Sequence, residues 1–250
     1  MNGKNTVLFI EPRRIKYVFN VLKRAVTVLK DDWNYVFYCG MGDKPYWDRI
    51  LPSVIEIIEL NVNNLNSKTY SDFLKTKQLW LSLKGDFVLT LQLDAWIVNC
   101  PPYTIDYFIN MNKSYIGGNM IYDWKDVWCD NNIPEPKIKN FNGGLSLRKR
   151  EDMIKIIDTY QPSLNSSGLD KYAEDVYFTI GGYLLNMDMG DDTESQHFSV
   201  HTIYKNKCFG MHNLERYNFD TEDPPKKVSA QYPRLKMINP YLSRDYNNYI

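Results

Sequence analysis

Apolar positions in the first part of the chain alternate between short continuous runs and helical spacing. Runs at residues 7–10, 35–39 and 87–91 predict buried strands, because each is short and bounded by turn residues. Between the first two runs, apolar residues from 15 to 29 recur every three or four positions, as in an amphipathic helix. This alternation predicts an α/β fold in which helices flank a mostly parallel central sheet.

The rest of the chain continues the pattern less regularly. Residues 54–60 fit either a strand or a helix, because their charges suit both. Other segments have a clearer periodicity. Helices are expected at residues 73–83, 151–159 and 175–185, and a strand at 141–147.

Two segments lack periodic positions. Residues 124–136 include Trp124, Trp128 and two prolines, and a loop of this length in a compact domain usually serves function. The residues beyond Tyr217 are rich in proline, tyrosine and charge. We therefore expect one domain over residues 1–217, with residues 218–250 as a C-terminal extension packed on it.

Composition narrows the class of protein. The chain has 250 residues, 44% of them hydrophobic, and its 30 basic residues balance 30 acidic ones. One sizeable core is expected, and the zero net charge argues against nucleic acid as a partner. No apolar stretch is long enough to span a membrane or to act as a secretory signal, so a cytoplasmic protein is expected. The abundance of Asn, Lys, Ile and Tyr hints at an AT-rich genome; for a viral protein, the compartment would be the host cytoplasm.

One predicted strand leads directly into a polar segment, Gln92-Leu93-Asp94. A carboxylate at the end of such a strand lies at the carboxyl edge of the sheet, where α/β proteins bind ligands. A hard divalent cation that bridges phosphates needs few protein ligands, because it keeps water and phosphate oxygens. Asp94 is therefore a candidate metal ligand. The plain alternative is an aspartate that caps a turn or a helix.

Two further segments carry candidate chemistry. After Asn142, the paired glycines Gly143 and Gly144 allow close backbone approach to a ligand, a left-handed conformation or a strand bulge. Glu174 and Asp175 stand where a helix is expected to begin, and the helix dipole favours their ionised forms. An ionised carboxylate can accept the proton of an attacking hydroxyl. Ordinary charge at a helix N-terminus is the plain alternative.

The chain has three histidines. His212 follows a run of Phe, Gly and Met that predicts a strand end, and it is a candidate partner for Asp94. His197 and His201 flank residues 198–200 and are predicted to be structural or surface residues. A lone histidine is seldom a metal ligand, so only its combination with Asp94 makes His212 a candidate.

In their order along the chain, these segments resemble a glycosyltransferase-like family catalogued as a domain of unknown function (DUF5672-type) and found in giant viruses, bacteria and fungi. The resemblance runs from about Val7 to His212. Its motifs are Glu11-Pro12-Arg13, Gln92-Leu93-Asp94, the Asn-Gly-Gly-Leu-Ser-Leu-Arg stretch at 142–148, the Glu-Asp-Val-Tyr-Phe stretch at 174–178 and Phe209-Gly210-Met211-His212. The Glu-Asp-Val-Tyr stretch is also similar to that of metal-dependent β-1,3-glycosyltransferases, whose second carboxylate is the catalytic base.

The resemblance implies a GT-A fold, a nucleotide-sugar donor such as a UDP-sugar, Mn²⁺ or Mg²⁺, and a glycan or other hydroxyl acceptor. A second copy of the chain is kept as a candidate partner. The implied site has four kinds of residue. Asp94 and His212 would hold the metal, and Asp175 would be the base of an inverting transfer, with Glu174 in reserve. The acceptor would stack on Trp124 and Trp128. The donor would be bound by Glu11, Arg13, Arg14, Gln92, Asp94, Asn142, Gly143 and Gly144.

The sequence departs from the expected motifs at two positions. Gln92 replaces the first carboxylate of the usual Asp-x-Asp, and His201 stands where an acidic residue is expected. Two alternatives stay open: a retaining transferase, whose Glu174 and Asp175 only position groups, and a nucleotide-sugar or glycan-binding module without turnover, for which Gln92 is the main reason.

Overall fold

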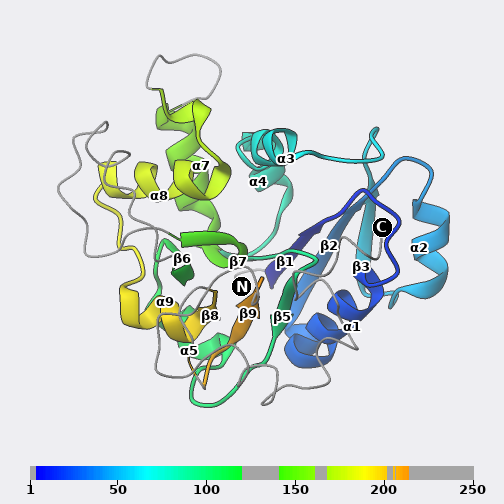
Figure 1. Ribbon diagram of the computed structural model, residues 1–250, viewed down its shortest axis with the longest axis horizontal. Helices are drawn as coiled ribbons and strands as arrows, with labels where there is room; N and C mark the ends of the chain where they lie inside the picture. Colours follow the sequence, from blue (N-terminus) through cyan, green and yellow to red (C-terminus); the bar gives the residue numbers. More distant parts are fainter. Residues whose placement is uncertain (1–3, 120–140, 161–167, 202–204, 206, 214–250) are drawn as a thin grey trace.

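A six-stranded β-sheet forms the centre of the protein (Figure 1). The computed structural model describes residues 4–119, 141–160, 168–201, 205 and 207–213. The strand order is β3-β2-β1-β4-β7-β6; the first four run parallel, and β7 is antiparallel to both of its neighbours. The strands are β1 (Asn5–Ile10), β2 (Trp33–Cys39), β3 (Ile55–Glu59), β4 (Phe87–Leu91), β6 (Tyr115–Asn119) and β7 (Phe141–Lys149). The mostly parallel central sheet predicted from the sequence is confirmed.

Helices cover both faces of this sheet. Figure 1 shows α3, α4, α7 and α8 on one face and α1 and α5 on the other. The helices are α1 (Val18–Leu29), α2 (Lys44–Ile50), α3 (Ser67–Leu74), α4 (Lys77–Ser82), α5 (Ile105–Met111), α7 (Arg150–Tyr160), α8 (Glu174–Leu184) and α9 (Asp192–Phe198), with short 3-10 helices η1 (Lys30–Asp32) and η2 (Leu169–Lys171).

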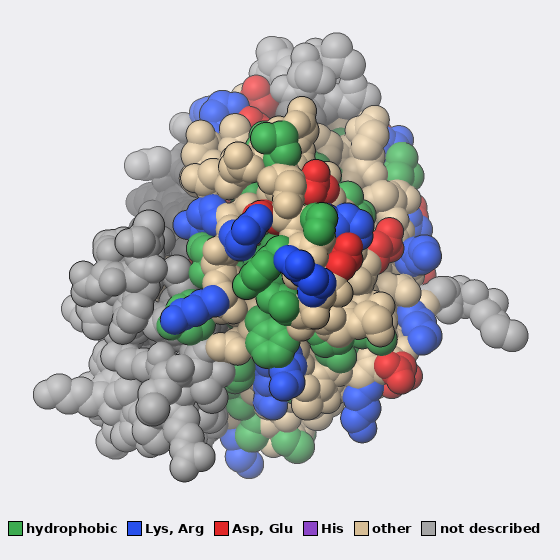
Figure 2. Space-filling view, turned by 90° about the vertical axis from the view of Figure 1, so that its right-hand side faces the viewer, with side chains coloured by type: hydrophobic (Ala, Val, Ile, Leu, Met, Phe, Trp, Pro, Cys, Tyr) green, Lys and Arg blue, Asp and Glu red, His purple; other side chains and the backbone are tan. Residues whose placement is uncertain are grey.

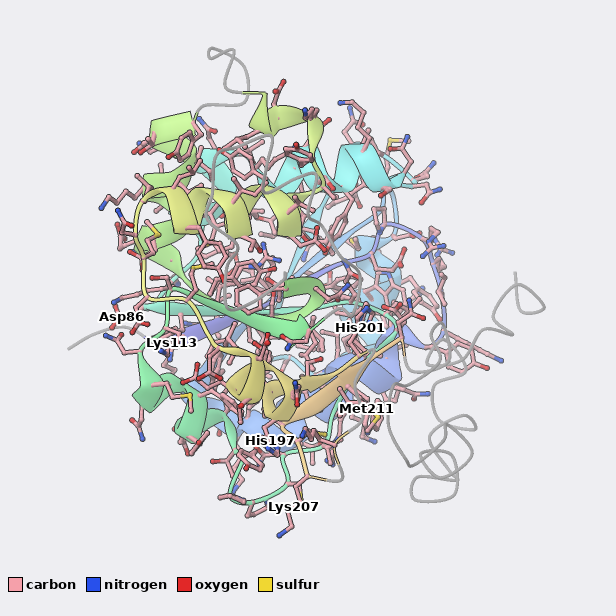
Figure 3. All side chains as sticks on the ribbon, turned by 60° about the vertical axis from the view of Figure 1, so that its left-hand side comes forward. Asp86, Lys113, His197, His201, Lys207 and Met211 are labelled. Carbon is pink, nitrogen blue, oxygen red and sulfur yellow. The ribbon has the colours of Figure 1, made fainter. Side chains whose placement is uncertain are left out.

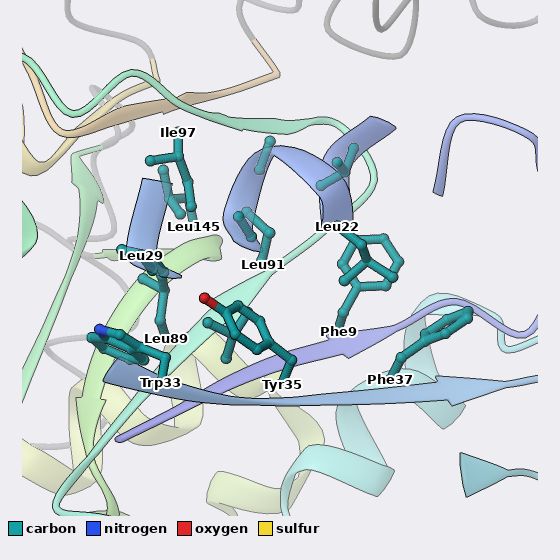
Figure 4. Packing of buried hydrophobic residues seen from close by; sticks show 14 of the residues in the cluster. Phe9, Leu22, Leu29, Trp33, Tyr35, Phe37, Leu89, Leu91, Ile97 and Leu145 are labelled. Atoms are coloured by element: carbon teal, nitrogen blue, oxygen red, sulfur yellow. The ribbon is translucent and has the colours of Figure 1, made fainter. Parts of the chain in front are cut away.

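The apolar run of β1 explains why the sheet is covered on both sides. Successive strand residues point to opposite faces. Val7 and Phe9 pack in the hydrophobic cluster under α1, whereas Leu8 and Ile10 pack in the cluster under α3, α4, α7 and α8. Figure 4 shows α1 lying over sheet side chains that include Phe9. A strand buried on both faces reads as a continuous apolar run, which is the pattern seen in the sequence.

A second, three-stranded sheet was not predicted. It consists of β5 (Ala95–Ile97), β9 (Gly210–His212) and β8 (Ser199–Val200), with β9 in the middle. β9 is antiparallel to β5, where His212 is opposite Ala95, and parallel to β8. The sheet therefore brings the last described strand next to the residues that follow β4.

The helix expected at residues 73–83 is instead two helices. α3 ends at Leu74, α4 begins at Lys77, and Thr76 between them is extended. Lys75 lies at the break, and its almost fully buried ammonium group turns inward to donate to the carbonyl oxygens of Asp170 (2.9 Å) and Tyr172 (3.1 Å). The question left open for residues 54–60 is answered by β3.

The surface of the described residues fits the balanced composition. On the face shown in Figure 2, basic and acidic side chains are interspersed with exposed hydrophobic ones. Among the described residues, the exposed large hydrophobic side chains include Met41, Val54 and Val62. A search of the described helices finds none with the length and apolar character needed to cross a bilayer.

Candidate active site

A pocket of about 450 Å³ lies beyond the carboxyl ends of β1 and β4. Its walls come from the loop after β1, from the start of α3 and from Gln92-Leu93-Asp94. Parallel strands direct their carboxyl ends to one edge, and this edge is where open α/β sheets bind ligands. The pocket therefore occupies the position that the strand order predicts.

Glu11 and Arg13 form one wall of the pocket as a single unit. The buried Glu11 carboxylate accepts from the Arg13 backbone amide (3.0 Å), from Nε (2.8 Å) and from Nη2 (2.7 Å). A two-pronged contact of this kind fixes the guanidinium plane. Arg14 points elsewhere: its Nε donates to Asp43 Oδ1 (2.7 Å), and its guanidinium lies 5.0 Å from the ring centre of Tyr46. Arg14 is not among the residues that line the pocket.

Asp94 and His212 are in direct contact at the other wall. Asp94 Oδ1 lies 3.0 Å from His212 Nε2. Burial alone would raise the pKa of Asp94, but the charge and hydrogen bond of His212 outweigh it and lower the pKa below its usual value. The structure thus brings together two residues that are far apart in sequence.

His201 extends this contact into the protein. Its Nδ1 lies 3.0 Å from the backbone oxygen of His212 and 3.3 Å from His212 Nδ1, and the two rings stack with centres 5.1 Å apart. The parallel register of β8 and β9, in which Val200 pairs with Met211, makes His201 and His212 neighbours. Figure 3 shows His201 well separated from His197, whose Nδ1 contacts the Lys207 oxygen at 2.9 Å. His201 is fully buried, as a structural residue would be, but sequence gave no sign of its contact with His212.

The paired glycines make room for side chains rather than for a turn. Neither has a positive φ angle. A Cβ on Gly144 would lie 2.1 Å from His212 Nε2, and a Cβ on Gly143 would lie 2.1 Å from Glu174 Oε1. Asn142 supports this backbone, because its Oδ1 accepts from the Gly144 amide at 2.8 Å. β7 therefore separates the Asp94–His212 contact from the start of α8.

We expect Gly144→Ala to displace the His212 ring, because nothing in the Gly144 backbone can move away from a 2.1 Å contact without disturbing β7. Overpacking of this kind costs about 1–3 kcal/mol of folding free energy. Urea unfolding measures it. Gly168→Asn is a matched control: Gly168 has φ 71° and open space around a Cβ, and asparagine tolerates that conformation. Equal stability of Gly144→Ala and the parent would contradict the packing described.

Glu174 and Asp175 begin α8 with different surroundings. The buried Glu174 carboxylate lies 2.7 Å from Arg148 Nη1. The half-buried Asp175 accepts from the amide of Val176 (2.8 Å), and the Gly143 amide also favours its ionised form. Burial and the charge of Glu174 raise the pKa of Asp175 to about 7, against the effect of those amides and of Arg148. The helix start was expected to favour the ionised form, but burial outweighs that effect.

Tyr70 links the two sides of the site and was missed by the sequence analysis. It lines the pocket from α3, and its hydroxyl is buried. Burial and the charge of Glu174 raise the pKa of Tyr70, and the side chain of Gln92 opposes this shift. No motif marks Tyr70, and it lies before the helix expected from the sequence at residues 73–83.

Other predicted site features lie outside the described residues. These are Trp124, Trp128, the loop at 124–136 and the extension at 218–250. Within the described ranges, no cluster of three or more His, Cys, Asp or Glu side chains has the arrangement of a metal site. Asp94 and His212 form a pair of potential ligands rather than such a cluster.

Comparison with known proteins places the fold. A solved structure of the galactosyltransferase LgtC, in complex with donor and acceptor sugar analogs, aligns with a TM-score of 0.56 over 98% of this chain and 100% of that chain. The identity is 11%, so this match shows the GT-A type of fold alone. No curated protein sequence matches the chain. Residues 54–213 match the family described as "Protein of unknown function (DUF5672)", and the chain belongs to this family.

Proposed function

We propose that the protein is a glycosyltransferase that moves a sugar from a nucleotide-sugar donor, in first place a UDP-sugar, to an acceptor hydroxyl. One observation carries the proposal. On a GT-A type of fold, a pocket at the carboxyl edge of the sheet is lined by Asp94, which contacts His212, and a carboxylate with a pKa of about 7 lies on the other side of β7 from that contact. Donor binding and proton removal are thereby assigned to neighbouring elements.

The Asp94–His212 pair fits a divalent ion. Adjacent ligands of an octahedral ion with bonds of about 2.1 Å lie about 3.0 Å apart. Asp94 Oδ1 and His212 Nε2 are separated by 3.0 Å. Two protein ligands leave the other positions to diphosphate oxygens and water, as Mg²⁺ and similar ions prefer. A bound Mn²⁺ or Mg²⁺ would offset the charge that develops on the leaving diphosphate.

The remaining donor contacts are assigned to the walls of the pocket. Arg13, held by Glu11, offers a fixed guanidinium for phosphate or nucleoside oxygens. Gln92 supplies a neutral amide where a second carboxylate would have added negative charge. Asn142, Gly143 and Gly144 are proposed to line the cleft beside the sugars. Arg14 keeps its proposed donor role only through a rearrangement, because it pairs with Asp43.

Asp175 is proposed as the base of an inverting displacement. The acceptor oxygen forms a bond to the anomeric carbon, the nucleoside diphosphate departs with the bonding electrons, and the hydroxyl proton passes to Asp175. A base is most effective when its pKa is near the working pH, and burial places Asp175 there. Glu174 is committed to Arg148, which favours Asp175 over its neighbour. Trp124 and Trp128 stay candidates for stacking on the acceptor.

Asp94→Ala and His212→Ala should each weaken Mn²⁺-dependent binding of nucleotide by at least about 100-fold. Loss of an indirect partner of a metal ligand already costs about 10- to 100-fold, so loss of a ligand should cost more. Calorimetry with UDP-, GDP- and dTDP-sugars, with and without Mn²⁺, measures the effect. Asp48→Ala removes an exposed carboxylate paired with Lys44 and should bind like the parent.

The outcomes separate the competing functions. If both alanine variants bind nucleotide with metal as tightly as the parent, the metal site is wrong. Metal-stimulated release of sugar from the donor supports an enzyme, whereas tight donor binding without any release supports the binding module that Gln92 suggests. A product that keeps the donor's anomeric configuration supports the retaining alternative.

A further inference from the structure

A fully buried ion pair lies beneath the proposed base and has no part in the reaction as described. Arg148 has no exposed surface, and its Nη1 is 2.7 Å from the Glu174 carboxylate. The guanidinium is also held between two rings, 4.6 Å from the centre of Tyr115 and 5.4 Å from that of Phe178. Its Nε donates to Ser146 Oγ at 2.9 Å.

Such a pair needs an explanation other than stability. Removing two charges from water costs about as much as their attraction returns, so well-packed hydrophobic residues usually serve a core equally well. Arg148 stands on β7 and Glu174 is the first residue of α8. The absence of a side chain at Gly143 allows the contact, because a Cβ there would lie 2.1 Å from Glu174 Oε1 and 2.8 Å from Arg148 Nη2. The pair thus ties the start of one helix to the strand beneath it.

The tied helix start carries Asp175 as its next residue. The Gly143 amide of the same strand favours the ionised form of Asp175, so the Asp175 carboxylate also faces β7. We propose that Glu174 and Arg148 are positioning residues: their ion pair fixes the first turn of α8 against β7 and so holds the Asp175 carboxylate at the Gly143 amide. The inference rests on the proposed role of Asp175 as the base. It replaces the reserve role of Glu174 as a proton acceptor with a structural one directed at its neighbour.

The pair also sets the charge around Asp175. The charged and titratable groups that face Asp175 are Glu174 on its own helix, Arg148 on β7 and Tyr115 on β6. Glu174 raises the pKa of Asp175 and Arg148 lowers it. Loss of Glu174 and loss of Arg148 should therefore shift the pKa of Asp175 in opposite directions, because each charge acts on Asp175 at short range. These shifts test that the pair lies against Asp175, and the position of the carboxylate needs a measurement of its own.

The test is a carboxyl titration by NMR on protein with ¹³C-labelled aspartate, which needs no substrate. The parent should show one aspartate with a midpoint near 7 that disappears in Asp175→Asn. Glu174→Gln should lower that midpoint by about one pH unit or more, and Arg148→Gln should raise it. Glu174→Asp keeps the charge and should keep the midpoint raised. If Arg148→Gln does not fold, the comparison of Glu174→Gln with Glu174→Asp still tests the inference.

A second measurement tests the position of Asp175 rather than its charge. In the parent, the Gly143 amide signal should follow the Asp175 titration, because this amide acts directly on the Asp175 carboxylate. The double variant Arg148→Met with Glu174→Leu removes both charges and keeps apolar volume. In this double variant, the Gly143 amide signal should no longer follow the Asp175 titration. Asp158→Asn breaks the exposed ion pair with Lys77 and should change neither signal.

Each result decides the inference. An unchanged midpoint in Glu174→Gln, or shifts of the same sign in Glu174→Gln and Arg148→Gln, would overturn it even if sugar transfer is observed. The expected shifts in a protein that transfers sugar from no nucleotide sugar would support it and reject the proposed function. The two proposals therefore fail separately.

Discussion

Asp175→Asn should lose about two to four orders of magnitude in transfer rate while it keeps metal-dependent donor binding. Asparagine preserves the shape and the contact with the Gly143 and Val176 amides but cannot accept a proton. Glu174→Gln should be less severe, because Glu174 is engaged by Arg148. A transfer assay, with the configuration of the product read by NMR, measures the loss. Near-normal turnover, or a product that retains configuration, would remove Asp175 from the role of base.

The pH dependence of the transfer rate also tests Asp175 as the base. A base must be ionised, so the transfer rate of the parent should rise through about pH 7 and level off above it. The folding stability should change in the opposite direction and fall as the pH rises. The pKa of Asp175 is higher in the folded chain than in the unfolded one, so its contribution is present below about pH 4 and is lost as the pH rises through about 7. Asp175→Asn lacks this loss and should melt at a higher temperature than the parent at pH 8.

Arg148→Met should destabilise the protein by about 3–5 kcal/mol, because it leaves the Glu174 carboxylate buried without its partner. Adding Glu174→Leu should recover most of this loss, since two apolar residues can replace a buried pair. Urea unfolding of the parent, the single variant and the double variant measures both steps.

Lys77→Met is the matched control, because it breaks an ion pair with Asp158 in which both side chains are well exposed. Its cost should be at most about 1 kcal/mol. A cost for Arg148→Met within that same range would show that Glu174 reaches water or another partner when Arg148 is removed.

Local pattern was enough for β1, β2, β4 and β7 of the central sheet, but it left β3 open and missed β6 and the second sheet. β1, β2 and β4 are continuous apolar runs buried on both faces, and such runs can be read without knowledge of their neighbours. β5, β8 and β9 have only two or three residues each, too few for any periodicity. The break between α3 and α4 was missed for a similar reason. At this break Lys75 turns inward to carbonyl oxygens about a hundred positions away, and such a contact leaves no mark on the local pattern.

The residues of the candidate site also fall into two groups, those that the sequence could identify and those that it could not. Asp94, Asp175 and His212 could be selected because each is a reactive residue at the predicted end of a strand or start of a helix. Arg148, Tyr70 and His201 could not. Their contacts depend on how β7, α3 and β8 meet other elements. The paired glycines were noticed, but a sequence cannot distinguish room for a ligand from room for His212 and Glu174.

The central place of β9 in the small sheet has a consequence for the order in which the protein is made. All six strands of the main sheet lie before residue 150, so this sheet has its full set of strands while the remainder of the chain is still being synthesised. β5 and β8 have no common partner until β9 emerges between them. The contact between Asp94 and His212 is therefore a late event of biosynthesis. A nascent chain that stops short of Gly210 can hold the main sheet and the Asp175 helix, but it lacks the strand that brings His212 to Asp94.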